Sequence, residues 1–324
     1  MIKAIALISG GLDSLLAAKL INKDGIEVLG LKFKMPFSVK SRRVLPGAGI
    51  EIREVDICED FLRIVEEPAH GRGSLMNPCI DCKIMMLKKA KEIMGQIGAK
   101  FIITGEVLGQ RPMSQHKEAL NIIAKAAGLE GLLLRPLSAK LLEETIPEKE
   151  GWVKRDNLLD FSGRGRTEQI ELAKRLGVRE YAQPAGGCLL TDPEFSKRLK
   201  DLMAHEVLSC DGVELLKTGR HFRLSDKARL VVGRNEKENE RILSLARDGD
   251  YLFMPGDDLA GPTSLGRGIF DDELVNLSCG ITCGYCDLNA DTDADIVYRR
   301  AGGQEKGVLR VSPVDRASLL DIRI

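Results

Sequence analysis

Near its N-terminus the chain reads Ile5-Ala6-Leu7-Ile8-Ser9-Gly10-Gly11-Leu12-Asp13-Ser14, and the helix-like run 15–21 follows. An apolar strand that ends in two glycines lets the backbone approach a polyphosphate closely. The N-terminus of the next helix offers unpaired N–H groups and the positive end of its dipole. The pattern therefore predicts a phosphate-binding loop built from Ser9, Gly10, Gly11 and Ser14. The alternative is a glycine-rich turn with a capping serine and no ligand.

Asp13 lies inside this loop. A carboxylate repels phosphate unless a divalent cation lies between them, so we expect Asp13 to hold Mg²⁺ and to take part in catalysis. The segment lacks the G-x-x-x-x-G-K-[ST] pattern of kinase-type loops, in which a lysine reaches the terminal phosphates. Transfer of the terminal phosphoryl group is therefore disfavoured.

The S-G-G-x-D-S motif, placed directly after a first strand, resembles the hallmark of the PP-loop ATP pyrophosphatases. The resemblance implies an adenine nucleotide alpha hydrolase-like fold and ATP as the bound nucleotide. It also implies cleavage of ATP between its α and β phosphates, which leaves an adenylylated substrate that a nucleophile then displaces.

The first 180 residues alternate strand-like and helix-like segments, which predicts an α/β fold with a doubly wound parallel sheet. Ligands of such sheets collect at the C-terminal ends of the strands, so we expect Phe33, Thr104, Gly105 and Gln110 to border the nucleotide. The expected strands are 3–9, 28–34, 51–57, 101–104 and 132–134, and the expected helices are 14–22, 83–97, 115–127 and 167–176.

From about residue 205 the pattern changes to short paired strands and one charged helix, which predicts a smaller C-terminal α+β module. Its stretches 232–239 and 256–266 are similar to the RNA-binding module at the C-terminus of ribosome-quality-control proteins. The expected organisation is an ATP-binding catalytic domain at 1–200, an RNA-binding module at 205–278 and a cysteine-containing tail at 279–324.

Cysteines cluster in the chain. Asn77-Pro78-Cys79-Ile80-Asp81-Cys82 has a spacing that lets two thiolates share one metal or cluster. A third candidate, Cys188, follows two glycines, and three cysteines would leave one iron of a 4Fe-4S cluster without a protein thiolate. The alternatives for these cysteines are a zinc half-site, a redox dithiol and an inert buried thiol.

These residues narrow the resemblance to the tRNA thiolation branch of the superfamily. The N-P-C-x-x-C motif is similar to that of 2-thiouridylases, and the stretch Thr104-Gly105-Glu106-Val107-Leu108-Gly109-Gln110 resembles 4-thiouridine synthetases. The resemblance implies Cys188 as the catalytic, sulfur-handling cysteine, with Cys79 and Cys82 as further cluster ligands. It also implies tRNA as substrate and a sulfur donor protein or sulfide as the source of sulfur.

The expected function is thus an ATP-dependent tRNA sulfurtransferase that thiolates uridine through an adenylylated base. Sulfur would come from an iron–sulfur cluster or a cysteine persulfide. The alternative is the same ATP chemistry applied to sulfur insertion or removal on a small molecule or free base. The domain that precedes the catalytic domain in 4-thiouridine synthetases is not in this sequence, so the basic stretch 217–241 and surface patches such as Arg164 and Arg166 are the candidate RNA contacts.

Cys279, Cys283 and Cys286 form a second group, for which zinc with a fourth ligand from elsewhere or a second cluster are equal alternatives. His116 lies at an expected helix start, where the alternatives are contact with phosphate, a role as an acid, or a structural place at the helix terminus.

Bulk properties limit the classes of protein to consider. A chain of 324 residues is longer than one hydrophobic core usually holds, so we expect more than one domain. The 48 basic residues balance 48 acidic ones, so a nucleic-acid contact must be a local patch. No apolar segment reaches a membrane-spanning length and the N-terminus does not resemble a signal peptide. We therefore expect a cytoplasmic protein without membrane contact, in which eight cysteines serve as ligands, redox groups or buried thiols.

Overall fold

The computed structural model describes residues 1–38, 49–179, 181, 188–257, 259–289, 292–304 and 306–324. It divides the chain into two compact units, Met1–Thr191 and Asp192–Ile324. Each unit has its own sheet and its own hydrophobic core.

The first unit is built on a parallel sheet of five strands in the order β3-β2-β1-β4-β5. Its strands lie at the five positions expected from the sequence, so the prediction of an α/β fold with a doubly wound parallel sheet is confirmed. The strands are β1 (Lys3–Leu7), β2 (Glu27–Lys34), β3 (Glu51–Asp56), β4 (Phe101–Ile103) and β5 (Leu133–Leu134).

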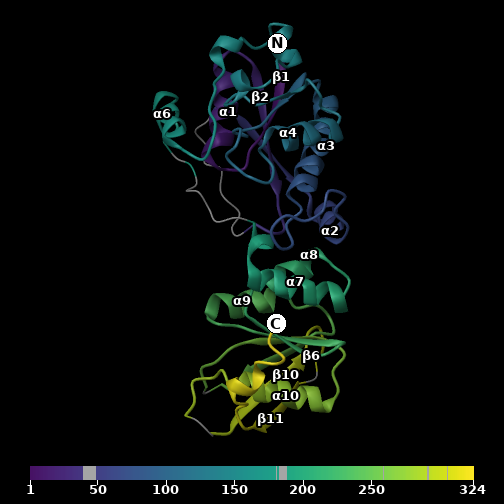
Figure 1. Ribbon diagram of the computed structural model, residues 1–324. Coiled ribbons are helices and arrows are strands. Elements are labelled where there is room, and N and C mark those ends of the chain that lie inside the picture. The colour runs from purple at the N-terminus through teal and green to yellow at the C-terminus, as the bar shows by residue number, and fades with distance from the viewer. Residues whose placement is uncertain (39–48, 180, 182–187, 258, 290–291, 305) are drawn as a thin grey trace. The chain divides into compact units, whose positions relative to one another are not determined.

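Helices cover both faces of this sheet, as Figure 1 shows. Because side chains of a strand alternate between faces, Ala4 and Ala6 of β1 pack with α1 (Leu12–Lys23) and α6 (Thr167–Arg175), whereas Ile5 packs on the other side. That side is covered by α3 (Cys79–Ile97) and α4 (Lys117–Ala126). Strands buried on both faces explain why the strand segments read as nearly continuous apolar runs.

The order of the strands reverses at β1. From β1 the chain passes to β2 and β3 on one side, and β4 and β5 lie on the other. In open α/β sheets ligands bind outside the carboxyl ends of the strands at such a switch point. The loops after β1 and β4 are therefore the expected binding edge.

Short helices complete the first unit. The four-residue helix α5 begins with a capping box in which Thr145 and Glu148 satisfy each other's backbone groups. The remaining elements are α2 (Cys58–Glu66), η1 (Ala139–Leu141), α5 (Ile146–Lys149), η2 (Arg155–Asn157) and η3 (Leu189–Thr191).

The second unit contains an antiparallel sheet of six strands in the order β11-β10-β8-β9-β7-β6, which confirms the predicted α+β module. Its strands are β6 (Arg220–Ser225), β7 (Ala228–Val232), β8 (Tyr251–Pro255), β9 (Ser264–Gly268), β10 (Ala294–Arg300) and β11 (Lys306–Val311). Its helices are α7 (Pro193–His205), α8 (Cys210–Leu216), α9 (Glu236–Ser244), α10 (Asp272–Cys283) and η4 (Arg316–Leu319).

The end of the chain differs from the expected separate tail. Strands β10 and β11 follow residue 278, yet β10 pairs with β8 along five residues and extends the sheet. Cys279 and Cys283 of α10 are buried in the core beneath it. The residues after 278 therefore complete the second unit, because without them β8 would lose one of its two partner strands and the core would lose part of its cover.

Among the helices of the described ranges, none combines the length and the apolar character that crossing a membrane requires.

Candidate functional site

The phosphate loop has the geometry of an open anion cradle. Gly10 has a φ of 77°, a backbone conformation that favours glycine, and Gly11 is the N-cap of α1 without any side-chain cap. The hydroxyls of Ser9 and Ser14 lie 3.2 Å apart, and Ser14 Oγ donates to the Gly11 carbonyl at 2.9 Å. The first N–H groups of α1 thus stay available to an anion at the positive end of the helix dipole.

The loop after β4 lies directly against this cradle. A Cβ atom placed on Gly105 would stand 2.4 Å from the Ser14 nitrogen and 2.5 Å from the Asp13 carbonyl carbon. Real Cβ atoms do not approach backbone so closely, so any larger residue at position 105 would displace one of the two loops. Glycine at this position is what allows two distant parts of the sequence to form one edge of the site.

Asp13 faces the same edge. The Gln110 side-chain amide donates to Asp13 Oδ2 at 3.2 Å, and the Arg166 guanidinium lies 3.8 Å from Oδ1. Among the described residues Oδ1 accepts no hydrogen bond although it is buried. A carboxylate oxygen that accepts no hydrogen bond beside a phosphate cradle is the type of ligand that Mg²⁺ takes, so Asp13 fits the predicted metal ligand.

Glu106 is the centre of a buried ion-pair network beside the loop. Its carboxylate accepts from Lys83 Nζ, from Arg135 Nε at 2.9 Å and from Thr104 Oγ1 at 3.1 Å. Burial by itself would raise the pKa of Glu106, but the charges of Lys83 and Arg135 outweigh it and hold the pKa at about 2. Lys83 belongs to the first turns of α3, so this network ties the cysteine-bearing helix to the loop after β4.

The three predicted sulfur ligands come together in the first unit. Cys79 and Cys82 lie in the first turn of α3, and Cys188 Sγ lies 3.7 Å from the Phe37 carbonyl. Burial raises the pKa of Cys82, and the neighbouring Cys188 and Cys79 raise it further. Burial also raises the pKa of Cys188, to about 11. A backbone hydrogen bond from Leu190 lowers this pKa, and the neighbouring Cys79 raises it. The thiols are thus near enough to influence one another, and all three are free.

Their chemistry suits a thiophilic ligand, whereas their positions do not amount to a formed metal centre. Thiolates bind zinc and iron–sulfur clusters, and three free thiols supply such donors. Throughout the described ranges, however, no group of three or more histidine, cysteine or acidic side chains is arranged to hold a metal ion. The two glycines that precede Cys188 lie outside the described residues.

A histidine and an aspartate accompany the cysteine pair. His70 Nδ1 lies 2.6 Å from Asp81 Oδ1, and the His70 backbone N–H donates to Asp81 Oδ2 at 2.9 Å. Asn77 Nδ2 donates to Cys79 Sγ at 3.0 Å. These contacts hold the segment before α3 against its first turn, and sequence analysis missed them because His70 has no ligand-like spacing to another histidine.

Other predicted residues have structural partners. Phe33 packs partly buried against the core beneath α3 and α4, and Thr104 donates to Glu106. His116 is the N-cap of α4, where its ring accepts from the Ala119 N–H at 3.3 Å, which matches the helix-end alternative. Arg135, directly after β5, is buried and forms an ion pair with Glu106.

The second cysteine group is buried in the core of the second unit. Cys279 is 0% exposed, Cys283 Sγ donates to the Val311 carbonyl at 3.6 Å and Cys286 Sγ to the Thr282 carbonyl at 3.4 Å. Burial raises the pKa of Cys279 and of Cys286 to about 12. The neighbouring Cys283 raises both pKa values further, so the thiols of this group lie near one another in the core. A metal or cluster bound by them stays a prediction.

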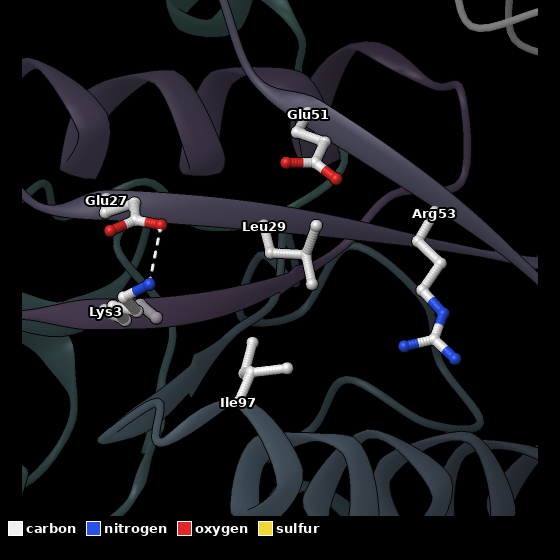
Figure 2. Close-up of a pocket in the computed structure, with 7 residues that line it drawn as sticks. Lys3, Glu27, Leu29, Glu51, Arg53 and Ile97 are labelled. Carbon is white, nitrogen blue, oxygen red and sulfur yellow. Dashed lines mark ion pairs between the residues drawn. The ribbon is translucent and has the colours of Figure 1, made fainter.

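A cavity of about 250 Å³ lies at the other end of the parallel sheet, as Figure 2 shows. It is lined by the first residues of three strands, among them Lys3 and Glu27, which form an ion pair at 3.0 Å, and Glu51. Parallel sheets bind ligands at the opposite, carboxyl edge. This cavity is therefore not the candidate site.

Comparisons with known proteins divide the chain in the same way as the structure. Residues 2–146 match the family model described as thiamine biosynthesis protein (ThiI), and residues 219–321 match the NFACT protein RNA binding domain. The two predicted resemblances, to the thiolation branch and to an RNA-binding module, are thereby confirmed for these segments.

Individual relatives agree with the first match. The chain is 34% identical over 155 residues to a probable tRNA sulfurtransferase of Thermococcus kodakarensis, covering 44% of this chain and 39% of that protein. It is 30% identical over 131 residues to the tRNA-specific 2-thiouridylase MnmA of Geobacter metallireducens, covering 32% of this chain and 34% of that protein. It also resembles a crystal structure of a 4-thiouridine synthetase–RNA complex with bound ATP, at 22% identity and a TM-score of 0.39, covering 66% of this chain and 52% of that one. The chain spans less than half the length of these curated relatives.

Proposed function

We propose that this chain is an ATP-dependent sulfurtransferase that thiolates a uridine of tRNA. The observation that carries the proposal is the meeting of two loops at the switch point of the sheet. The phosphate cradle of Ser9–Ser14 and the loop that begins at Gly105 are in backbone contact, on the same unit as three free thiols. The tRNA substrate is supported by relatives named tRNA sulfurtransferases and by the RNA-binding family match.

ATP binds with its phosphates on the first N–H groups of α1 and the hydroxyls of Ser9 and Ser14. Asp13, whose Oδ1 accepts no hydrogen bond, would hold Mg²⁺, and the bound ion would neutralise the charge that develops on departing pyrophosphate. Gln110, through its hydrogen bond at 3.2 Å, keeps the carboxylate turned toward the cradle.

The reaction proceeds in two displacements. A uridine carbonyl oxygen attacks the α-phosphorus, a new O–P bond forms and pyrophosphate leaves with the electrons of the broken P–O bond. A sulfur nucleophile then attacks the activated carbon, and AMP leaves with the former carbonyl oxygen. A paired target base would first be unstacked at a cost of a few kcal/mol.

Sulfur reaches the base by one of two routes. In the first, hydrosulfide attacks the activated carbon directly. In the second, a donor protein transfers sulfane sulfur to Cys188, the outer sulfur of the resulting persulfide attacks the carbon, and a second thiol then cleaves the S–S bond, which leaves a disulfide that an external thiol reduces. A 4Fe-4S cluster bound by Cys79, Cys82 and Cys188 would supply an open iron where hydrosulfide binds. Because burial raises the pKa of Cys82 and Cys188, the thiols are protonated at neutral pH, and loading them with iron releases protons.

The test is thiolation of unmodified tRNA by the full chain with ATP, Mg²⁺ and sulfide, read by mass spectrometry of the nucleosides. We expect thiouridine and equal amounts of AMP and pyrophosphate. Cys188→Ala should abolish thiouridine formation and keep ATP binding, whereas Cys286→Ala, a matched change of a buried thiol in the other unit, should keep both. Turnover of ATP with a small molecule but never with tRNA would support the alternative substrate class.

The same preparation separates the two sulfur routes. Protein purified without oxygen is assayed for iron and acid-labile sulfide beside its activity. A colourless, iron-free and fully active preparation excludes the cluster, whereas activity that rises with iron content supports it.

A further inference from the structure

The second unit carries a group of arginines gathered around Tyr285. The Arg220 guanidinium carbon lies 4.6 Å from the centre of the Tyr285 ring, and that of Arg316 lies 4.7 Å from the same ring. Arg220 belongs to β6 and Arg316 to η4, almost 100 residues later in the chain. Two cations on one aromatic ring are a concentration of positive charge that the fold has to assemble from distant segments.

Backbone contacts fix both side chains. Arg316 Nε donates to the Gly284 carbonyl at 2.8 Å, and one terminal nitrogen of Arg220 donates to the Gly233 carbonyl at 3.2 Å. The Tyr285 ring itself packs on Phe222 of β6 at 6.2 Å. Each guanidinium thus keeps further N–H groups for a ligand while its position is set in advance.

Further arginines lie beside this pair. The last residues of the chain run along β6, with Arg323 bridged to Phe222, and Arg198 of α7 donates to the Leu216 carbonyl at 2.7 Å. Burial lowers the pKa of Arg220, and the charges of Arg234, Arg316 and Arg323 lower it further. The arginines therefore repel one another, and an anion would relieve that repulsion.

These side chains, like Arg299 and Arg300, form no ion pair with a described carboxylate, whereas other arginines of the unit have such partners. Arg223, Arg229 and Arg267 form ion pairs with Asp201, Glu206 and Asp250. Within the described ranges no ion pair joins Arg220, Arg316, Arg198 or Arg323 to a carboxylate, and Arg234 is paired with Glu238. Several cations of the expected basic stretch 217–241 are thus neutralised. Arg220, Lys227 and Lys237 form no ion pair with a described carboxylate, and Arg220 is the one of these three that lies on Tyr285.

We propose that Arg220 and Arg316, held on Tyr285 and flanked by Arg198 and Arg323, bind phosphodiester groups of the RNA substrate. Planar guanidinium groups match phosphate geometry, and a fixed group of arginines without ion-paired carboxylates binds a polyanion without sequence preference. The proposal rests on tRNA as the substrate and adds the surface of the second unit that grips it.

The test is the salt dependence of tRNA binding by the full chain. For Arg316→Gln and Arg220→Gln we expect about tenfold weaker binding at moderate salt and a slope of log K against log salt that is smaller by about one for each. Arg316 is exposed, so its variant keeps the fold. Arg310→Gln is the matched control, because Arg310 is exposed on β11 and lies 3.5 Å from Asp295.

Variants of Tyr285 test whether its ring positions the two arginines for tRNA binding. Tyr285→Phe keeps the ring and should bind tRNA as the natural protein does, whereas Tyr285→Ala should weaken binding. If the variants of Arg220 and Arg316 bind tRNA with an unchanged slope of log K against log salt, the proposed binding surface is wrong. If these variants still thiolate tRNA, the proposed function stands. A natural protein that neither binds nor thiolates tRNA overturns both.

Discussion

Replacing Glu106 by glutamine tests the buried network that joins α3 to the site. Glutamine keeps the shape but leaves Lys83 and Arg135 without a counter-charge, and breaking a buried pair costs about 3–5 kcal/mol. The pKa of Glu106 gives a free energy of similar size: its fall from 4.5 to about 2 on folding corresponds to roughly 3 kcal/mol of stability. Because the pKa is lowered, this stability is present above pH 4.5 and is lost as the pH falls toward 2.

Urea unfolding followed by fluorescence of Trp152, the single tryptophan of the chain, reports the first unit alone. With a denaturant slope of about 2 kcal/mol per molar, Glu106→Gln should lower the urea midpoint at pH 7 by about 1.5 M. It should also remove most of the loss of stability between pH 4.5 and 2. Glu54→Gln, which removes an exposed ion pair with Lys32, is the control and should change the midpoint little. Equal midpoints for the two variants would refute the reasoning.

Three further changes probe the loop and its surroundings. Gly105→Ala should raise the Kd for ATP at least about tenfold, because a Cβ 2.4 Å from the Ser14 nitrogen must move the cradle, whereas Gly95→Ala, with open space around its Cβ, should leave calorimetric ATP binding unchanged. Asp13→Asn should remove the Mg²⁺ dependence of ATP binding in the same titration, and a Mg²⁺ response like that of the natural protein would contradict its role as a ligand. His116→Ala should lower the stability of the first unit by about 1 kcal/mol through loss of a helix cap while ATP binding persists, and weaker ATP binding would instead assign His116 to the site.

The phosphate loop and its neighbour were predictable because their signals are local. A strand, two glycines and a helix start specify the turn, and the strand-end rule brings the segment from Thr104 to the same edge. The contact of Gly105 with Ser14 follows from that rule without any knowledge of side chains.

The Glu106 network was not predictable from spacing. Its partners Lys83 and Arg135 lie 23 and 29 residues away in sequence, and pairing across such separations depends on the packing of α3 and β5. Glu106 stands in the quoted thiolation-like motif and Lys83 directly follows the cysteine pair, and these positions are the signals that could have found them.

The surroundings of the C-terminal cysteines were not predictable from their spacing. Cys279 and Cys283 are four residues apart on one helix and therefore lie on the same buried face. A ligand shared by these cysteines stays a prediction, and their burial in the core of the second unit is what the spacing alone does not reveal.

The fate of one oxygen atom tests the central claim most directly. The full chain is given ATP, Mg²⁺, sulfide and tRNA whose target uridine carries ¹⁸O at the carbonyl that is replaced, and the AMP is analysed by mass spectrometry. Activation of the base by adenylylation predicts one ¹⁸O in each AMP for each thiouridine formed. Thiouridine formed together with unlabelled AMP would contradict it.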